Sequence, residues 1–228
     1  CNQVVLDTIE TGAALGVAME SGLLAFGDAK GAEEIIRQIG RGDILGRVIG
    51  NGAVVTGQVL NNHRVPAIHG QAIPAYDPRS LKGIGVTYVT SPMGADHTAG
   101  NTLETVKNLP PRGREKQVET SYKLQIRAAL LDSLGVCLFI RPAFVKNPEL
   151  MPRLLNARYG WKLTYPEVQR MGKACLEAEK RFNHLAGRDE TLCDVPEFMR
   201  FEPLPPHNTI FDISRNEMYE VWNSEIEE

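Results

Sequence analysis

The sequence lacks an excess of charge of either sign, and it lacks any long apolar run. Its 228 residues include 25 Lys and Arg and 28 Asp and Glu, so the formal net charge is −3. A nucleic-acid-binding protein usually has a basic face, so this balance argues against nucleic acid as a partner. No apolar run approaches the length that spans a bilayer, and Asp7 and Glu10 interrupt the first apolar stretch. We therefore expect no membrane span and no secretory leader.

Closely spaced cysteine pairs and strand-like alternation are also missing. The 4 cysteines are scattered as Cys1, Cys137, Cys175 and Cys193. A disulfide framework is therefore not expected, and the default location is a reducing cytoplasm. Because a cubane iron–sulfur cluster usually needs four cysteines, a cluster made from this chain alone is not expected either. The chain begins with Cys1 rather than Met, inside what reads as a helix, so we expect a piece of a longer polypeptide.

Apolar residues at helical spacing place the chain in a mostly α, multihelical class. Thr164 is the expected N-cap of the strongest helix, with Glu167 as its capping-box partner. The segment 83–100 is expected to be a loop, because its few apolar residues could not form a core among so many Gly and hydroxyl residues. Such a loop, if ordered, usually surrounds a ligand. A Pro-rich segment, 196–206, is expected to be extended. The expected helices span residues 4–24, 28–39, 44–55, 119–134, 165–185 and 216–226.

The most informative segment is the second hexamer, Asp132–Cys137, where an acid and a thiol flank a glycine. Gly135 lies where a helix should end, since glycine enters the left-handed conformation without steric cost. A thiolate there could hold a metal or cluster, and a carboxylate could accept hydrogen bonds from ring N–H groups. The alternative is a small buried cysteine after a helix end. The first hexamer, Asn2–Asp7, resembles it position by position, so the two could bind similar halves of one ligand, unless the similarity is chance.

His97 is the candidate for acid–base chemistry. It lies in the Gly-rich and hydroxyl-rich segment 91–100, and its ordinary pKa lies near neutrality. The alternative is a histidine in a surface loop. The remaining histidines are interpreted as structural or exposed, and they are His63, His69, His184 and His207.

Five segments, in order along almost the whole chain, resemble the second and third domains of the tungsten-dependent aldehyde:ferredoxin oxidoreductases. They are residues 1–11, 73–79, 90–100, 132–137 and 182–205. The resemblance implies two helical subdomains, 1–108 and 109–228, packed around a pterin cofactor site. The boundary is left open, and the two subdomains are allowed to interleave.

The resemblance also implies cofactors and residue roles. The family holds a mononuclear tungsten, in some members molybdenum, on the dithiolenes of two pterins beside a [4Fe–4S] cluster. Its two pterin motifs have the form Asp-x-x-Gly-Leu-Asp/Cys. By analogy, Cys137 is a cluster ligand and His97 is the histidine near the metal that moves protons. The implied pterin-binding residues are Asn2, Leu6, Asp7, Asp132, Gly135 and Val136, with departures from the motif at Asn2 and at Val5.

The implied reaction oxidises a small aldehyde with water to a carboxylic acid, and the electrons pass through the cluster to ferredoxin or another electron-transfer subunit. The implied partner within the same polypeptide is the missing N-terminal domain, so the chain alone is expected to be inactive; a homo-oligomer is left open. Two alternatives remain. One is a related tungstoenzyme, such as the reducing subunit of benzoyl-CoA reductase complexes. The other is a non-catalytic helical interaction domain, which the departures at Asn2 and Val5 favour.

Overall fold

The computed structural model describes residues 1–189 and 193–223, and it is mostly helical. The described residues form 11 α-helices, with 57% of the structure helical, and they contain a single two-stranded sheet. The expected mostly α, multihelical class is therefore confirmed. Within the described residues no single helix is long and apolar enough to cross a membrane. The two helical segments Gln117–Ser133 and Leu138–Lys146 are together long and apolar enough, but they are bent by 118° relative to each other.

Four helices form the N-terminal unit of the fold. Fully buried alanines such as Ala14 and Ala53 let these helices pack closely. The helix expected over 44–55 is split, because Gly52 adopts φ +93 and a Cβ there would meet Glu10 Oε1 at 2.5 Å. The first helix begins later than expected, because Val5 is left-handed at φ 54. The unit consists of the 3₁₀ turn η1 (Asn2–Val4) with α1 (Thr8–Glu20), α2 (Ala29–Arg41), α3 (Ile44–Gly50) and α4 (Gly52–Val59).

A short hairpin follows, formed by β1 (Ala67–Ile68) and β2 (Gln71–Ala72). The strands are antiparallel, with Ala67 opposite Ala72 and Ile68 opposite Gln71. Both turn residues have positive φ, 55 at His69 and 81 at Gly70. Left-handed angles at both central residues match the twist of the flanking strands, so the turn fixes the register of this hairpin.

The central helix α5 (Lys82–Thr90) corrects the prediction of a loop over 83–100. All nine residues of α5 are buried. A Cβ at Gly83 would meet Gln117 Oε1 at 2.5 Å, and one at Gly85 would meet Phe211 Cε2 at 2.6 Å. The glycines therefore allow close helix packing rather than a loop, which sequence composition does not distinguish.

The long helix α6 (Gln117–Ser133) packs against α5, α9 (Tyr165–Leu185) and α11 (Arg215–Asn223). The expected capping box of α9 is confirmed, since the Thr164 N–H donates to Glu167 Oε2 at 2.7 Å. The last expected helix matches α11 up to residue 223, and its residues 224–226 lie outside the described ones. The remaining elements between α5 and α9 are η2 (Thr102–Thr105), η3 (Leu138–Ile140), α7 (Arg141–Lys146) and α8 (Leu150–Tyr159).

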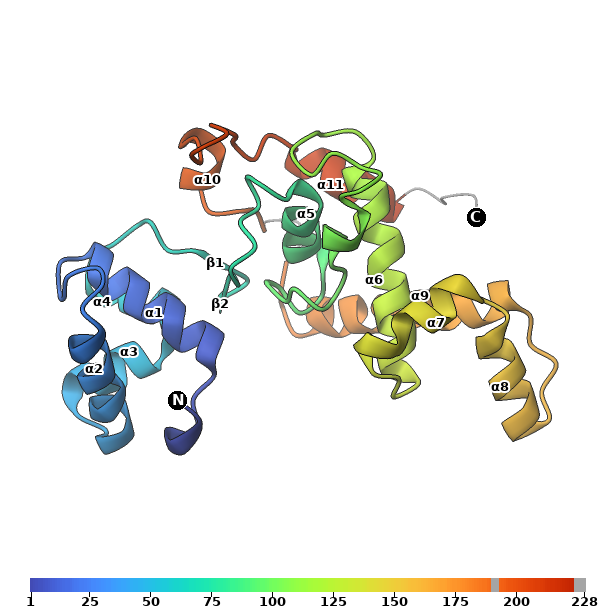
Figure 1. Cartoon of the computed structure of the whole chain (residues 1–228), viewed down its shortest axis with the longest axis horizontal. Coiled ribbons are helices and arrows are strands. Elements are labelled where there is room, and N and C mark those ends of the chain that lie inside the picture. The colour runs from blue at the N-terminus through green and yellow to red at the C-terminus, as the bar shows by residue number, and fades with distance from the viewer. Residues whose placement is uncertain (190–192, 224–228) are drawn as a thin grey trace.

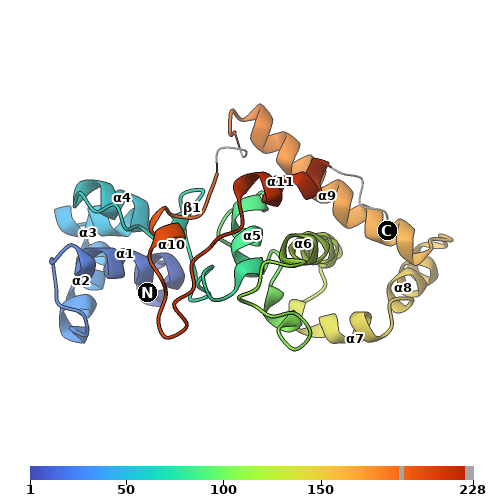
Figure 2. The ribbon, with the colours of Figure 1, turned by 90° about the horizontal axis from the view of Figure 1, so that it is seen from above.

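The N-terminal unit lies at one end of an elongated molecule and α8 lies at the other (Figures 1 and 2). The segment 196–206, expected to be extended, contains the short helix α10 (Phe198–Phe201), which lies between α1 and α5 in the view of Figure 2. Arg64 joins these parts through ion pairs of 2.6 Å to both Glu20 and Glu202. Helices α5 and α6 pack together across the expected boundary at residue 108. The division into two subdomains stays a prediction.

Candidate functional site

The first hexamer forms one helical turn that ends in a left-handed residue. Val5 has φ 54 and ψ 46, and its N–H donates to the Asn2 carbonyl at 3.3 Å. The Leu6 N–H donates to the carbonyl of Cys1 at 3.3 Å. Asp7 follows in an extended conformation, with φ −63 and ψ 133, as the N-cap of α1.

The second hexamer has the same backbone path at the end of α6. Gly135 has φ 65, and its N–H donates to the Asp132 carbonyl at 3.0 Å. The Val136 N–H donates to the carbonyl of Leu131 at 2.8 Å. Cys137 then has φ −58 and ψ 135 as the N-cap of η3.

The similarity of the two hexamers is thus structural as well as sequential. In each, the fourth residue is left-handed and donates to the first, and the fifth donates to the residue before the hexamer. This is the hydrogen-bond pattern of a Schellman helix end. Val5 keeps it although β-branched residues avoid left-handed angles, and its side chain is 92% exposed. The backbone therefore presents Asp7 and Cys137 in equivalent positions.

The polar side chains of the second hexamer are open to a ligand. Asp132 and Cys137 are both exposed, and the Cys137 thiol is in no disulfide. Burial of part of the Asp132 carboxyl raises its pKa, and the negative charge of Asp96 raises that pKa further. The alternative of a buried cysteine after a helix end is therefore wrong.

A pocket of about 490 Å³ brings the first hexamer together with His97. Asp7 lines it from the start of α1, and His97 lines it from the loop after α5. We call it the His97 pocket, and its lining residues are Asp7, Ile9, Glu10, Gln71, Ala72, Pro74, Met93, Ala95, Asp96 and His97. The other predicted site residues do not line it, and they are Asn2, Leu6, Asp132, Gly135, Val136 and Cys137.

The His97 ring is stacked on one face, and its side chain remains partly exposed. It stacks on Tyr76 with a centroid distance of 5.6 Å and an interplanar angle of 28°. Its Nδ1 lies 3.9 Å from Asp96 Oδ1, which is beyond hydrogen-bond distance. Asp96 Oδ1 instead accepts from the Thr98 N–H at 2.8 Å. With 32% of its side chain exposed, His97 is available to a ligand in the pocket.

Asp96 connects the His97 pocket with the second hexamer. It lines the pocket beside His97, and its charge acts on the carboxyl of Asp132. Electrostatic effects on a pKa need charges that lie close together, because solvent screens distant ones. The first hexamer therefore lies directly on the pocket through Asp7, and the Asp132 carboxyl of the second hexamer is influenced by the charge of the pocket residue Asp96.

The loop that carries His97 is held at the Pro92 carbonyl by Asn183 of α9 and by Arg188, which follows that helix. Arg188 donates through Nε to His69 Nδ1 at 3.0 Å, and Asn183 donates to the Pro92 carbonyl at 2.9 Å. A guanidinium only donates, so His69 Nδ1 accepts and the ring proton lies on Nε2. That Nε2 lies 3.2 Å from the Val89 carbonyl, to which it donates. His69 is structural, as expected.

Sequence reasoning missed Glu10, which ties the pocket wall together. Its Oε1 accepts from the Ala53 N–H and its Oε2 from the Ala72 N–H, both at 2.8 Å. The two residues that donate to Glu10 lie 43 and 62 positions away along the chain, so no local sequence pattern predicts these contacts. Glu10 thereby joins α1 to the start of α4 and to β2.

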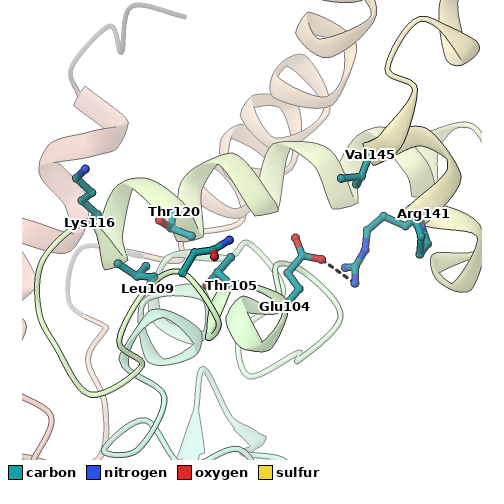
Figure 3. Close-up of a pocket in the computed structure, with 9 residues that line it drawn as sticks. Glu104, Thr105, Leu109, Lys116, Thr120, Arg141 and Val145 are labelled. Atoms are coloured by element: carbon teal, nitrogen blue, oxygen red, sulfur yellow. Dashed lines mark ion pairs between the residues drawn. The ribbon is translucent and has the colours of Figure 1, made fainter.

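A second pocket, of about 530 Å³, lies between η2, α6 and α7 (Figure 3). None of the predicted site residues lines it. Arg141 at the start of α7 points to Glu104 of η2, with an ion pair of 2.8 Å, and Arg127 of α6 also pairs with Glu104. These ion pairs fix the segment that follows Cys137.

The described residues do not form a complete metal site. No group of three or more His, Cys, Asp or Glu side chains in residues 1–189 and 193–223 is placed to hold a metal ion. Cys137 offers one open thiol, and a cubane cluster needs further thiolates. The residues present fit one edge of a cofactor site rather than a whole one.

These features define a multihelical chain that carries two turns of equal conformation, one of which borders the His97 pocket. The model of the aldehyde ferredoxin oxidoreductase family, domains 2 and 3, matches residues 1–223. The chain belongs to this family, which confirms the resemblance found in the sequence.

Curated relatives agree with the family. The tungsten-containing aldehyde ferredoxin oxidoreductase of Pyrococcus furiosus is 29% identical over 227 residues, 90% of this chain and 37% of the relative. That of Thermococcus kodakarensis is 29% identical over 230 residues, with 90% and 37% covered. That of Pyrococcus abyssi is 27% identical over 224 residues, with 88% and 37% covered. The chain thus spans 37% of the length of these relatives.

Proposed function

We propose that this chain forms part of a tungsten or molybdenum bis-pterin oxidoreductase that oxidises aldehydes to carboxylic acids. Electrons would leave through a [4Fe–4S] cluster to ferredoxin or a similar carrier. The supporting observation is that Asp7 and His97 line one pocket, whose wall residue Asp96 acts on Asp132. This supports the proposal, because a residue of the first hexamer lies beside the candidate acid–base group.

The chain's own residues fit such a cofactor at one edge. The exposed carboxylate of Asp132 accepts no hydrogen bond from any described residue, so it has capacity for N–H donors of a pterin ring. One carboxylate oxygen of Asp7 accepts a hydrogen bond from the Glu10 N–H, at 2.7 Å, and the other oxygen is left for a ligand. Cys137 would supply one cluster thiolate, so the remaining ligands would come from outside this chain.

The bound metal and pterins would supply the two-electron acceptor, because redox chemistry of this kind belongs to a cofactor. The protein's task is to orient the aldehyde and water and to handle two protons. His97 is suited to this task, since it lines the pocket and an imidazole can both accept and donate a proton. Its stacking on Tyr76 fixes the ring plane, so that the exchange occurs at a defined place.

The experiment is an aldehyde-dependent dye-reduction assay on the complete protein that contains this chain. His97→Gln should lower kcat by about 100-fold or more, which is the usual contribution of a positioned acid–base group. The matched control is His184→Gln, which changes an exposed histidine of α9 outside the pocket. Equal rates for the two variants would contradict the role of His97. Absence of aldehyde oxidation by a metal-loaded wild type would contradict the reaction itself.

A further inference from the structure

The end of α8 presents two aromatic rings to solvent. Tyr159 is the last residue of that helix and Trp161 lies just beyond it, with 56% and 48% of their surfaces exposed. The two rings stack, with centroids 4.6 Å apart and an interplanar angle of 23°. The Arg158 guanidinium lies over the Tyr159 ring, 5.4 Å from its centroid. We call Arg158, Tyr159 and Trp161 the α8 platform. Apolar groups that are exposed together, rather than singly, mark interaction sites.

The backbone under the α8 platform is fixed by hydrogen bonds. Gly160 is left-handed at φ 71, and its N–H donates to the Asn156 carbonyl at 2.9 Å. The Asn156 side chain closes the turn, since it donates to the Leu163 carbonyl and accepts from the Leu163 N–H, both at 2.9 Å. A surface that is already ordered loses little conformational entropy when a partner binds.

The charge around the platform is positive, although the whole chain has a net charge of −3. Residues 138–163 contain 5 basic residues and 1 acidic residue. The acidic residue, Glu149, is the N-cap at the opposite end of α8. The basic residues nearest the platform are exposed and form no ion pair with a described residue, and they are Arg153, Arg158 and Lys162. Complementary charge selects a partner and speeds its association, so this surface fits an acidic one.

The platform belongs to the same packed unit as the neighbour of Cys137. Val136 precedes Cys137 and Leu163 follows Lys162, and both pack against one core cluster. That cluster consists of Leu130, Leu131, Met151 and Val168. Helix α8 lies at the end of the molecule opposite the N-terminal helices (Figure 1). A protein bound to the platform would therefore contact the unit that contains the candidate cluster ligand.

We infer that the α8 platform is the docking surface for an acidic electron-carrier protein. The inference rests on the proposed function, which requires such a carrier, and it adds the place where the carrier binds. Trp, Tyr and Arg are the residues that supply most of the binding energy in protein interfaces. The exposed Arg153 and Lys162 add the charge that attracts an acidic partner.

The kinetic test uses the complete enzyme with two electron acceptors, an acidic ferredoxin and the small dye benzyl viologen, which needs no protein docking surface. Trp161→Ala should raise the KM for ferredoxin by about ten-fold or more, the loss typical of an aromatic interface anchor, and leave the dye rate unchanged. Phe26→Ala is the matched control, since Phe26 is 68% exposed between α1 and α2. A Trp161→Ala enzyme with the ferredoxin KM of Phe26→Ala would overturn the inference.

A charge variant tests the electrostatic part of the inference. Lys162→Glu should raise the KM for ferredoxin and weaken its dependence on salt, because a favourable charge on the docking surface is reversed. Lys30→Glu makes the same change at an exposed residue of α2 and should do neither. Equal effects of the two variants would mean that only net charge matters, and would refute docking at the platform.

A binding measurement without aldehyde separates this inference from the reaction. In biolayer interferometry, ferredoxin should bind the complete wild-type protein and Phe26→Ala, and bind Trp161→Ala at least about ten-fold more weakly. This result in a protein that oxidises no aldehyde would refute the proposed function and leave the docking surface standing. Equal binding by all three proteins would refute the docking surface even if the enzyme oxidises aldehydes with the dye.

Two further outcomes would assign the platform to another partner and overturn the inference. If Trp161→Ala lowers the Tm of the complete protein and leaves ferredoxin binding intact, the platform packs against another part of the same protein. If the wild type binds vesicles of anionic lipid through Trp161 and does not bind ferredoxin, the platform is a membrane contact.

Discussion

Gly135→Val should destabilise the fold through backbone conformation alone. Gly135 has φ +65, and an added Cβ would meet no heavy atom within 4 Å. The added Cβ therefore causes no clash, and the substitution mainly reports the cost of a left-handed residue. The same substitution exists naturally in the first hexamer, where Val5 has φ 54.

The cost follows from the conformations of the two residues. An L-residue pays about 1–2 kcal/mol to adopt the left-handed conformation, more when it is β-branched. Replacing glycine also lowers the conformational entropy of the unfolded chain, which stabilises the folded state by about 0.4–1 kcal/mol. The net loss in free energy of unfolding is about 1 kcal/mol, so Tm should fall by about 2–4 °C for a protein of this size.

Calorimetry of the wild-type chain and three variants tests this reasoning. Gly135→Asn should be nearly neutral, because Asn enters the left-handed conformation readily. Gly12→Val is the matched control, since Gly12 is exposed in α1 with no neighbour within 4 Å of an added Cβ. There Val is a better helix former than Gly, so Tm should stay or rise slightly. A Gly135→Val variant as stable as Gly135→Asn would refute the conformational argument.

Three further predictions follow from other contacts. Glu10→Ala leaves two backbone N–H groups without their acceptor, so urea unfolding should show a loss of about 2–4 kcal/mol, with a smaller loss for Glu10→Gln. Burial raises the pKa of Cys193 from 9.0 to about 11, so its contribution to stability is complete below pH 9 and lost as pH rises through 11; Cys193→Ala should abolish this alkaline slope. Asp96→Asn should lower the pKa of Asp132, measured by ¹³C NMR of its carboxyl, and an unchanged pKa would place Asp96 out of range.

The sequence predicted the parts of the structure that depend on local chemistry. The capping box at Thr164 and the left-handed Gly135 both formed as expected. Each involves residues within one turn of each other, where side-chain and backbone preferences decide the conformation. The similarity of the two hexamers belongs to this class, and it held even where Val5 replaces a glycine.

The sequence did not predict the parts that depend on distant packing. The glycines of segment 83–90 suggested a loop, yet they form the most buried helix because Gln117 and Phe211 approach them closely. The pocket around His97 was likewise hidden, since its wall joins α1, β2 and the loop after α5. The roles assigned to Cys137 and the pterin-binding residues rest on the family motif and stay predictions.

The most direct test of the proposed function is metal, iron and pterin analysis of the complete protein, with and without the Cys137 thiol. The wild type should contain tungsten or molybdenum, pterin and the iron of one cluster. Cys137→Ser should lose iron and the cluster absorption, whereas Cys175→Ser, which alters another free cysteine, should keep both. Retained iron and an unchanged spectrum in Cys137→Ser would contradict the account.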